Sequence, residues 1–244
     1  HFNSEYMNIA LIGYGKMGKE IEQILLKRGH TVSLRSTRSA PFKAADLAGS
    51  DVAIEFTEPS AAVDNILKCF EAGVPVVVGT TGWYTRMPEV KEACEKTNGA
   101  LLAASNLSIG VNLVFEFNRQ LAAIMRSFEE YSPSMEEIHH LAKRDAPSGT
   151  AITLAEGVLE NYPERSEWIN EATDNPHQLG IVSRREGEVP GTHIVRYTSE
   201  VDEIQLVHQA FNRKGFALGA VKAAEFMLGK RGVFGMGDLL RTGY

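Results

Sequence analysis

The chain has 244 residues, of which 43% are hydrophobic and 23% are charged, and its formal net charge is −6. This length allows one large domain or two small ones, each with a buried core. The negative charge argues against nucleic acid as the main partner, because nucleic acid favours strongly basic surfaces. No apolar run approaches the roughly 18 residues that a membrane helix needs, so we expect no membrane partner.

The N-terminal residues and the two cysteines bear on where in the cell the protein is expected. Residues 1–6 are polar and aromatic and lack the apolar stretch of a signal peptide. We expect them to be the remnant of an expression tag, with Met7 as the natural start. Cys69 and Cys94 lie in helix-like patterns without metal-type spacing, which predicts reduced structural thiols in a cytoplasmic protein.

The N-terminal part alternates short apolar runs with helical patterns. Strands are predicted at residues 7–12, 31–34, 51–56, 75–78 and 100–104, and helices at residues 18–29, 59–73 and 87–96. This alternation is typical of right-handed βαβ units around a parallel sheet that is covered on both faces. It predicts an α/β domain of the Rossmann type.

The order of predicted helices and strands changes in the second half of the chain. A long amphipathic helix is predicted at residues 109–125, a strand at 135–141, a helix at 150–160, strands at 181–184, 193–199 and 203–209, and a closing helix at 215–228. Successive strands without intervening helices predict an open mixed or antiparallel sheet, hence a separate α+β domain. We therefore expect one domain from residues 7–107 and 214–244 and another from residues 108–213.

A glycine fingerprint follows the first predicted strand. Gly13, Gly15 and Gly18 form G-x-G-x-x-G between that strand and a helix. In this context the first glycine permits the tight turn, the second lets the backbone approach a pyrophosphate, and the third lets helix and strand pack closely. The amides at the helix start, which includes Lys16 and Met17, would then face the phosphates.

The segment after the second strand bears on the choice of cofactor. No acidic residue occurs between Glu22 and Asp46, whereas an NAD-preferring site usually places one there for the ribose. Arg35 and Ser36 stand in that segment, and an arginine matches a 2′-phosphate in charge and geometry. NADPH is therefore predicted, with NADH still possible. The alternative is that these arginines belong to a solvated loop.

Residues 136–150, EEIHHLAKRDAPSGT, gather two histidines and two cations ahead of a helix. One histidine could be a core residue, and Lys143 and Arg144 could be solvated. A metal site is disfavoured, because no Cys–His cluster or HExxH pattern accompanies the pair. The functional interpretation explains more of the segment: amides at the start of the helix after Ser148 bind a carboxylate, while histidine and Lys143 neutralise a second one and supply a proton.

Residues 137–150 resemble the signature of the bacterial 4-hydroxy-tetrahydrodipicolinate reductases, which act in the diaminopimelate branch of lysine synthesis. The resemblance extends from Met7 to about Leu240 and includes GTTG at residues 79–82, SNLSIGVN at 105–112 and GTH at 191–193. It implies reduction of a small cyclic dicarboxylate by NAD(P)H with loss of water. It also implies a homotetramer that assembles through the sheet of the second, substrate-binding domain.

The resemblance assigns roles residue by residue. His139 and Lys143 would be catalytic, and His140, Ser148, Gly149 and Thr150 would bind the substrate. The cofactor would contact Gly13, Gly15, Lys16, Met17, Gly18, Arg35, Ser36, Gly79, Thr80, Thr81, Ala104, Ser105, Asn106, Leu107 and Arg213. No metal is implied. Leu107 stands where the family usually has an aromatic residue.

Two other functions remain open at this point. One is a related two-domain NAD(P)-dependent amino-acid dehydrogenase or imine reductase. The other is an NAD(P)-binding sensor that performs no chemistry. The H-H-x-x-K pattern of residues 139–143 weighs against both, because it suits a ring with two carboxylates and a sensor has no need of a proton donor.

Overall fold

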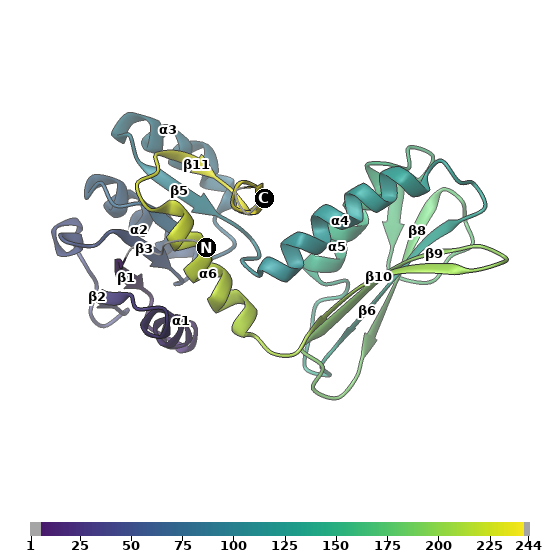
Figure 1. Ribbon diagram of the computed structural model, residues 1–244, viewed down its shortest axis with the longest axis horizontal. Helices are drawn as coiled ribbons and strands as arrows, with labels where there is room; N and C mark the ends of the chain where they lie inside the picture. Colours follow the sequence, from purple (N-terminus) through teal and green to yellow (C-terminus); the bar gives the residue numbers. More distant parts are fainter. Residues whose placement is uncertain (1–5, 242–244) are drawn as a thin grey trace. The chain divides into compact units, whose positions relative to one another are not determined.

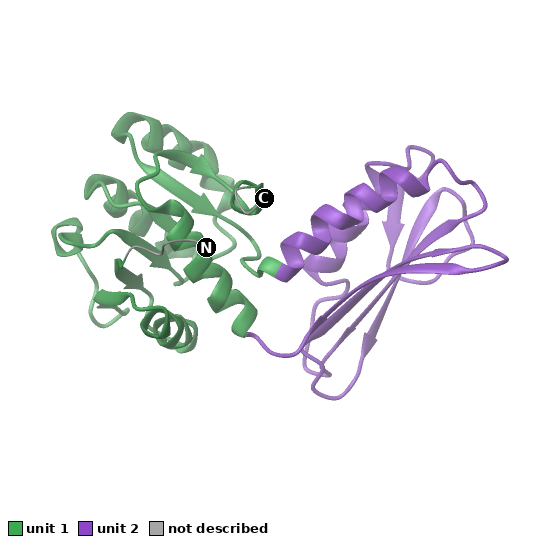
Figure 2. Ribbon diagram, in the orientation of Figure 1, with its two compact units in different colours: residues 1–109, 214–244 green, residues 110–213 purple. Residues whose placement is uncertain are grey.

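The computed structural model describes residues 6–241, which form two compact units (Figure 2). Unit 1 ends at Ile109 and resumes at Lys214, and unit 2 runs from Gly110 to Arg213. The domain boundaries predicted from the sequence lie after residue 107 and before residue 214. Residues 1–5 of the expected tag remnant, and residues 242–244 of the predicted first domain, lie outside the described residues.

Unit 1 contains a six-stranded sheet in the order β11-β5-β4-β3-β1-β2, and all of its pairings are parallel. The strands are β1 (Asn8–Ile12), β2 (Thr31–Ser36), β3 (Val52–Glu55), β4 (Val76–Val78), β5 (Ala100–Ala103) and β11 (Gly232–Phe234). The predicted Rossmann-type parallel sheet is thus confirmed. The edge strand β11 was not predicted, because its three residues include only two apolar side chains within a glycine-rich tail.

Helices cover both faces of this sheet (Figure 1). They are α1 (Lys16–Lys27), α2 (Pro59–Glu71), α3 (Met87–Thr97), α6 (Lys214–Met227) and α7 (Met236–Arg241), with short 3₁₀ turns η1 (Ala44–Leu47) and η2 (Tyr84–Arg86). Alternate side chains of β1 explain the arrangement: Ile9 and Leu11 pack with α1 and α6, whereas Ala10 and Ile12 pack with α2 and α3. A strand buried on both faces is apolar throughout, as the predicted first strand is.

A close contact fixes the segment that follows β5. Leu107 is buried in the unit 1 core, and Gly219 of α6 lies directly against its carbonyl group. A Cβ atom at position 219 would come within 1.6 Å of that oxygen, so only glycine fits. The backbone after β5, which the sequence analysis assigns to the cofactor, is therefore held by α6.

Unit 2 is built on a five-stranded mixed sheet in the order β10-β9-β6-β8-β7. Its elements are α4 (Ile109–Met125, whose first residue belongs to unit 1), β6 (Ser132–His139), α5 (Gly149–Leu159), β7 (Glu167–Ile169), β8 (Gln178–Arg185), β9 (Gly191–Thr198) and β10 (Glu203–Ala210). β9 pairs antiparallel with β6 and β10, while β8 pairs parallel with β6 and β7. This confirms the predicted mixed sheet; only β7 was missed.

One face of this sheet changes character along the strands. Met135 of β6 pairs with Ile181 and Val195, and together they form the core under α4 and α5 (Figure 1). Two residues on, Glu137 pairs with Ser183 and His193 on the same face. The sheet therefore leads from an apolar core into a buried polar cluster near the start of α5.

No described helix is long and apolar enough to span a lipid bilayer. Both cysteines are buried and unpaired. The cytoplasmic location inferred from them stays a prediction.

Candidate active site

The glycine fingerprint forms a tight turn between β1 and α1. Gly13 has φ +96°, and a Cβ there would lie 1.9 Å from the carbonyl oxygen of Phe56. The amides of Gly13 and Tyr14 donate to the carbonyl oxygen of Ser36, at 3.1 and 2.9 Å. Gly15 is the N-cap of α1 and faces open space. The first turn of α1 is therefore open to an anion such as a pyrophosphate.

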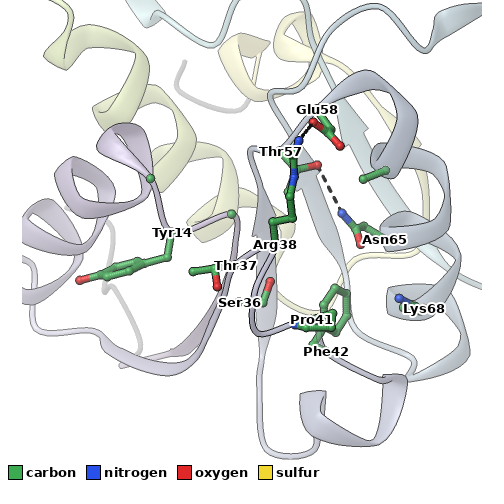
Figure 3. Close-up of a pocket in the computed structure, with 13 residues that line it drawn as sticks. Tyr14, Ser36, Thr37, Arg38, Pro41, Phe42, Thr57, Glu58, Asn65 and Lys68 are labelled. Atoms are coloured by element: carbon green, nitrogen blue, oxygen red, sulfur yellow. Dashed lines mark hydrogen bonds and ion pairs between the residues drawn. The ribbon is translucent and has the colours of Figure 1, made fainter.

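A cavity of about 440 Å³ lies beside this turn (Figure 3). It collects residues from the ends of β1, β2 and β3 and from α2: Gly13, Tyr14, Gly15, Ser36, Thr37, Arg38, Pro41, Phe42, Thr57, Glu58, Ala61, Asn65 and Lys68. Ligands of open α/β sheets bind at the carboxyl ends of the strands, where this cavity is. Two cations, Arg38 and Lys68, give it a positive side suited to phosphate.

The two arginines of the predicted 2′-phosphate segment lie in different places. The Arg35 guanidinium pairs with Glu22 of α1, 3.0 Å from Nε to Oε1, and lies 5.7 Å from the centre of the Tyr14 ring. The hydrogen bond from Arg35 lowers the pKa of Glu22. Arg38 lines the cavity and forms an ion pair with Glu58 at its rim (Figure 3). Of the two residues predicted to bind the 2′-phosphate, Ser36 lines this cavity and Arg35 does not.

The residues assigned to the nicotinamide show mixed roles. Thr80 is buried, its hydroxyl accepts from the amide of Thr57 at 2.7 Å, and its carbonyl oxygen accepts from Trp83 Nε1 at 2.8 Å. Gly79 packs on the Phe56 ring, where a Cβ would come within 2.1 Å. Thr81 is exposed. The contacts of Thr80 therefore hold the loop in place, and Thr81 lies on the exposed side of the loop.

The remaining predicted cofactor residues are spread over both units. In unit 1, Lys16 and Ser105 are exposed, Met17, Ala104 and Asn106 are half-buried, Gly18 packs against the Gly13 carbonyl, and the Leu107 side chain lies in the core. Arg213, the last residue of unit 2, is exposed.

Lys143 lies in the loop between β6 and α5, where its Nζ atom pairs with the carboxylate of Asp145 at 2.8 and 2.9 Å. Arg185 of β8 donates to the carbonyl oxygens of Lys143 and Asp145, at 3.3 and 2.6 Å. The hydrogen bond from Lys143 lowers the pKa of Asp145. The sheet thus holds this loop through Arg185, and the ammonium group stays partly accessible, with 21% of the side chain exposed.

The start of α5 is prepared for a carboxylate. Ser148 is its N-cap, and the Ser148 hydroxyl accepts from the amide of Ala151 at 3.2 Å. Among the described residues, none accepts a hydrogen bond from the amide of Gly149 or Thr150. Gly149 also faces open space. Two free amides at the positive end of a helix form an anion site.

His139 is the last residue of β6, and His140 directly follows the strand. His139 is buried on the face that carries Glu137, and its Nδ1 atom lies 3.3 Å from Glu137 Oε2. Its ring meets that of His193 edge to face, with centroids 5.0 Å apart. His140 is half-buried at the end of β6. Only His139 of this pair belongs to the polar cluster.

Two protein-family models match the chain, one in each half. The family model described as "Dihydrodipicolinate reductase, N-terminus" matches residues 7–107, and "Dihydrodipicolinate reductase, C-terminus" matches residues 110–240. The chain belongs to the dihydrodipicolinate reductase family. The resemblance seen in residues 137–150 is thereby confirmed, and it supports the reductase function in lysine biosynthesis that the resemblance implied.

Similar proteins agree with this membership. The chain is 46% identical over 235 residues to the 4-hydroxy-tetrahydrodipicolinate reductase of Christiangramia forsetii, covering 96% of this chain and 98% of that protein. It is 39% identical to the enzyme of the same name from an Anaeromyxobacter species, covering 80% and 74%.

Among solved structures, the dipicolinate-bound dihydrodipicolinate reductase of Paenisporosarcina sp. TG-14 shares the fold. Its TM-score is 0.75 at 21% identity, with coverage of 95% of this chain and 98% of that one. Aspartate dehydrogenase from Thermotoga maritima is similar with a TM-score of 0.50 at 11% identity, covering 95% of this chain and 100% of that one. At such identities the likeness concerns the fold alone.

The structure adds four polar residues to this family member's site that the sequence analysis did not assign: Glu137, Ser183, Arg185 and His193. Glu137 could have been found from the alternation of a strand, since it lies two residues before His139. The others come from β8 and β9, so only strand pairing brings them there. Donor atoms of Glu137, His139 and His193 lie within 4.8 Å of one another, a grouping that sequence spacing does not reveal.

Burial of His193 generates a prediction about acid stability. Burial, together with the nearby charge of His139, lowers the pKa of His193 to about 4 from an ordinary 6.5. The unfolded chain therefore binds a proton between pH 6.5 and 4 that the folded chain does not. We expect the free energy of unfolding to be highest above pH 6.5 and to fall across this range by on the order of 3 kcal/mol.

Urea unfolding at pH 7 and pH 5, followed by circular dichroism, measures this loss. The variant His193→Gln should lose less stability between the two pH values than the unmodified chain. His177→Gln is the matched control, because His177 is exposed. An equal pH dependence in the unmodified chain and His193→Gln would contradict the prediction.

Proposed function

We propose that this chain reduces 4-hydroxy-tetrahydrodipicolinate to tetrahydrodipicolinate with NAD(P)H. The ring loses its hydroxyl group as water and gains one hydride and one proton. The observation that carries the proposal is the α5 start: free amides of Gly149 and Thr150 lie next to a loop that carries the ammonium group of Lys143. This combination suits an anionic ring that must receive a proton.

The residues of unit 1 fit the cofactor. The open amide end of α1 after Gly15 suits the pyrophosphate, and the cavity beside it suits the adenosine half. When bound, the nicotinamide supplies the hydride. The loop at Gly79 and Thr80 is held to the end of β3 through the amide of Thr57, and it would orient the nicotinamide ring from one side.

The residues of unit 2 fit the substrate. The amides of Gly149 and Thr150 would bind one carboxylate, and Lys143 and His140 the other. Hydride addition leaves an electron-rich ring carbon that must take up a proton, and Lys143 Nζ or His139 is the donor. Asp145 accepts two hydrogen bonds from Lys143 Nζ and so positions the ammonium group in the loop.

We expect Lys143→Ala to lower kcat by about 10²- to 10⁴-fold, the usual contribution of a positioned proton donor. The assay follows oxidation of the reduced nicotinamide, with the substrate generated from pyruvate and aspartate semialdehyde by the upstream synthase. Arg144→Ala removes the neighbouring exposed cation and should change kcat by no more than a few-fold.

An inactive unmodified chain, in the presence of an active synthase, would refute the reductase. Oxidation of L-aspartate by NAD(P)⁺ under the same conditions would instead favour the amino-acid dehydrogenase alternative. Full activity of Lys143→Ala would remove Lys143 from the proton step.

We further propose that NADPH is preferred and that Arg38 is the residue that selects it. Arg38 and the hydroxyl groups of Ser36 and Thr37 line the cavity after β2, and Lys68 lies across it, 5.0 Å above the Phe42 ring (Figure 3). A guanidinium group matches a 2′-phosphate in charge and hydrogen-bonding geometry. Arg38 also pairs with Glu58, but that pair lies at the cavity, whereas Arg35 pairs with Glu22 and does not line the cavity.

Arg38→Ala should raise the KM for NADPH by about 10- to 100-fold, since a charge-assisted contact contributes roughly 1.5–3 kcal/mol. The KM for NADH should stay nearly constant, because NADH lacks the 2′-phosphate. Arg35→Ala is the matched control and should change the NADPH to NADH ratio much less. Equal kcat/KM for both cofactors in the unmodified chain, or equal losses in the two variants, would contradict the assignment.

We also propose a homotetramer that uses the outer face of the unit 2 sheet. Across this face Val182, Ile194 and Val207 lie in one row with Glu136 between them, and 49% of Val207 is exposed. The α4 and α5 helices pack on the opposite face (Figure 1). An exposed apolar row on a sheet without a covering helix suits burial between subunits.

Light scattering of the purified chain should give the mass of four subunits. Val207→Glu should shift it towards smaller species, because the added charge would be buried in the interface. Ile124→Glu, at an exposed apolar side chain of α4, is the matched control and should leave the mass unchanged. A monomer at all protein concentrations would refute the proposal.

A further inference from the structure

A buried carboxylate lies at the centre of the polar cluster in unit 2. Glu137 of β6 is fully buried, at 0% exposure, between neighbouring strands and the start of α5. Burial alone would raise its pKa, but the contacts with His139, Ser148 and Ser183 outweigh burial and lower the pKa to about 2. The side chain is therefore ionised, and a buried ionised group persists only where its contacts compensate it.

The Oε1 atom of Glu137 anchors the start of α5. It accepts from the amide of Ser148 at 3.0 Å and from the hydroxyl of Ser183 at 2.7 Å. The Arg185 guanidinium, which also holds the loop after β6, lies 3.8 Å away. The residue directly before the free amides of Gly149 and Thr150 is thus fixed to two strands by one oxygen atom.

The Oε2 atom faces the histidines. It lies 3.3 Å from His139 Nδ1 and 3.7 Å from His193 Nε2. Among the described residues, neither Oε2 nor His139 Nδ1 has a hydrogen-bond partner. A carboxylate beside Nδ1 favours the tautomer with the proton on that nitrogen, which leaves Nε2 free to exchange a proton.

We propose that Glu137 is a positioning residue, which sets the α5 amides through one oxygen and the tautomer of His139 through the other. It contacts neither substrate nor cofactor itself. Its effect on turnover rests on the proposed function, whereas its effect on the His139 ring does not.

The same atoms invite a second interpretation, a cation site, because Glu137, His139 and His193 place three donor atoms within 4.8 Å. The positioning role accounts for more contacts. Oε1 already accepts two hydrogen bonds, and Arg185 supplies a positive charge beside it. His193 Nε2 also lies 3.1 Å from the Ser148 hydroxyl, which gives this ring a partner without a metal.

Glu137→Gln tests the proposal through the His139 ring. The amide and hydroxyl donors at Oε1 require the new carboxamide oxygen to take that place, so its NH₂ group must face His139 Nδ1. We expect His139 to move its proton from Nδ1 to Nε2. Nitrogen NMR of histidine-labelled protein, with the His139 signals assigned from a His139→Gln sample, reports the tautomer. An unchanged tautomer would overturn the proposal.

Kinetics form the second arm. Glu137→Gln should lower kcat/KM for the substrate by about 10- to 100-fold, as removal of supporting groups behind catalytic residues often does. The KM for NADPH should stay within about twofold. Glu137→Asp, which keeps the charge, should recover part of the activity. Glu203→Gln, on an exposed carboxylate at the far end of β10, is the control and should match the unmodified chain.

Two further measurements keep the proposal open to refutation. Should Glu137→Gln fail to fold, as seen by thermal melting, Ser183→Ala removes one donor to Oε1 while the charge remains. Ser183→Ala should raise the substrate KM by about fivefold, which corresponds to the loss of one hydrogen bond, and should leave the His139 tautomer unchanged. No change in KM would overturn the anchoring role.

Activity that is lost on treatment with a chelator and restored by Zn²⁺ alone would assign the cluster to a cation instead, and would also overturn the proposal. An unmodified chain without reductase activity, but with the expected His139 tautomer change in Glu137→Gln, would count against the proposed function alone.

Discussion

The charge on Glu137 constrains much of unit 2. An ionised carboxylate with no exposed surface needs compensating contacts. Ser183 of β8 and the N-cap Ser148 of α5 donate to it, while His139 and His193 lie 3.3 and 3.7 Å away. Because the same elements carry His139 and the free amides of α5, this buried charge links the two places where we propose proton transfer and carboxylate binding.

The sheet of unit 2 serves two purposes along one face. Where Met135 meets Ile181 and Val195, the face is apolar and packs with α4 and α5. Two residues further on, the same face turns polar at Glu137 and His193. A core at one end gives rigidity to the cluster at the other end, since the strands that carry the polar groups cannot shift without disturbing the packing.

Unit 1 prepares its anion site by a different device, which is close backbone approach. Gly13 lies too near the Phe56 carbonyl for any side chain, and Gly15 leaves the helix start uncovered. Arg38 and Lys68 line the side of the cavity, and Lys16 follows Gly15 at the start of α1. Both arginines form ion pairs, Arg35 with Glu22 of α1 and Arg38 with Glu58, but only the Arg38 pair lies at the cavity.

The sequence by itself determined the fold class and the family, because these rest on local signals. The spacing of apolar runs indicated the parallel sheet and the change to a mixed one, and the predicted helix at residues 109–125 has the bounds of α4. G-x-G-x-x-G and residues 137–150 are contiguous, so their chemistry is readable along the chain. The short strands β7 and β11 were missed, since three residues carry too little periodicity to register.

Only the tertiary structure decided which side chains lie next to these residues. Arg35 and Arg38 are equivalent as letters, yet packing of α1 against β2 pairs the first with Glu22, while the second reaches the cavity. Ser183 and His193 lie 46 and 56 residues after Glu137, and strand pairing alone places them beside it. Periodicity describes which face of a strand a residue occupies. Which strands become neighbours depends on burial across the whole domain, which no local pattern contains.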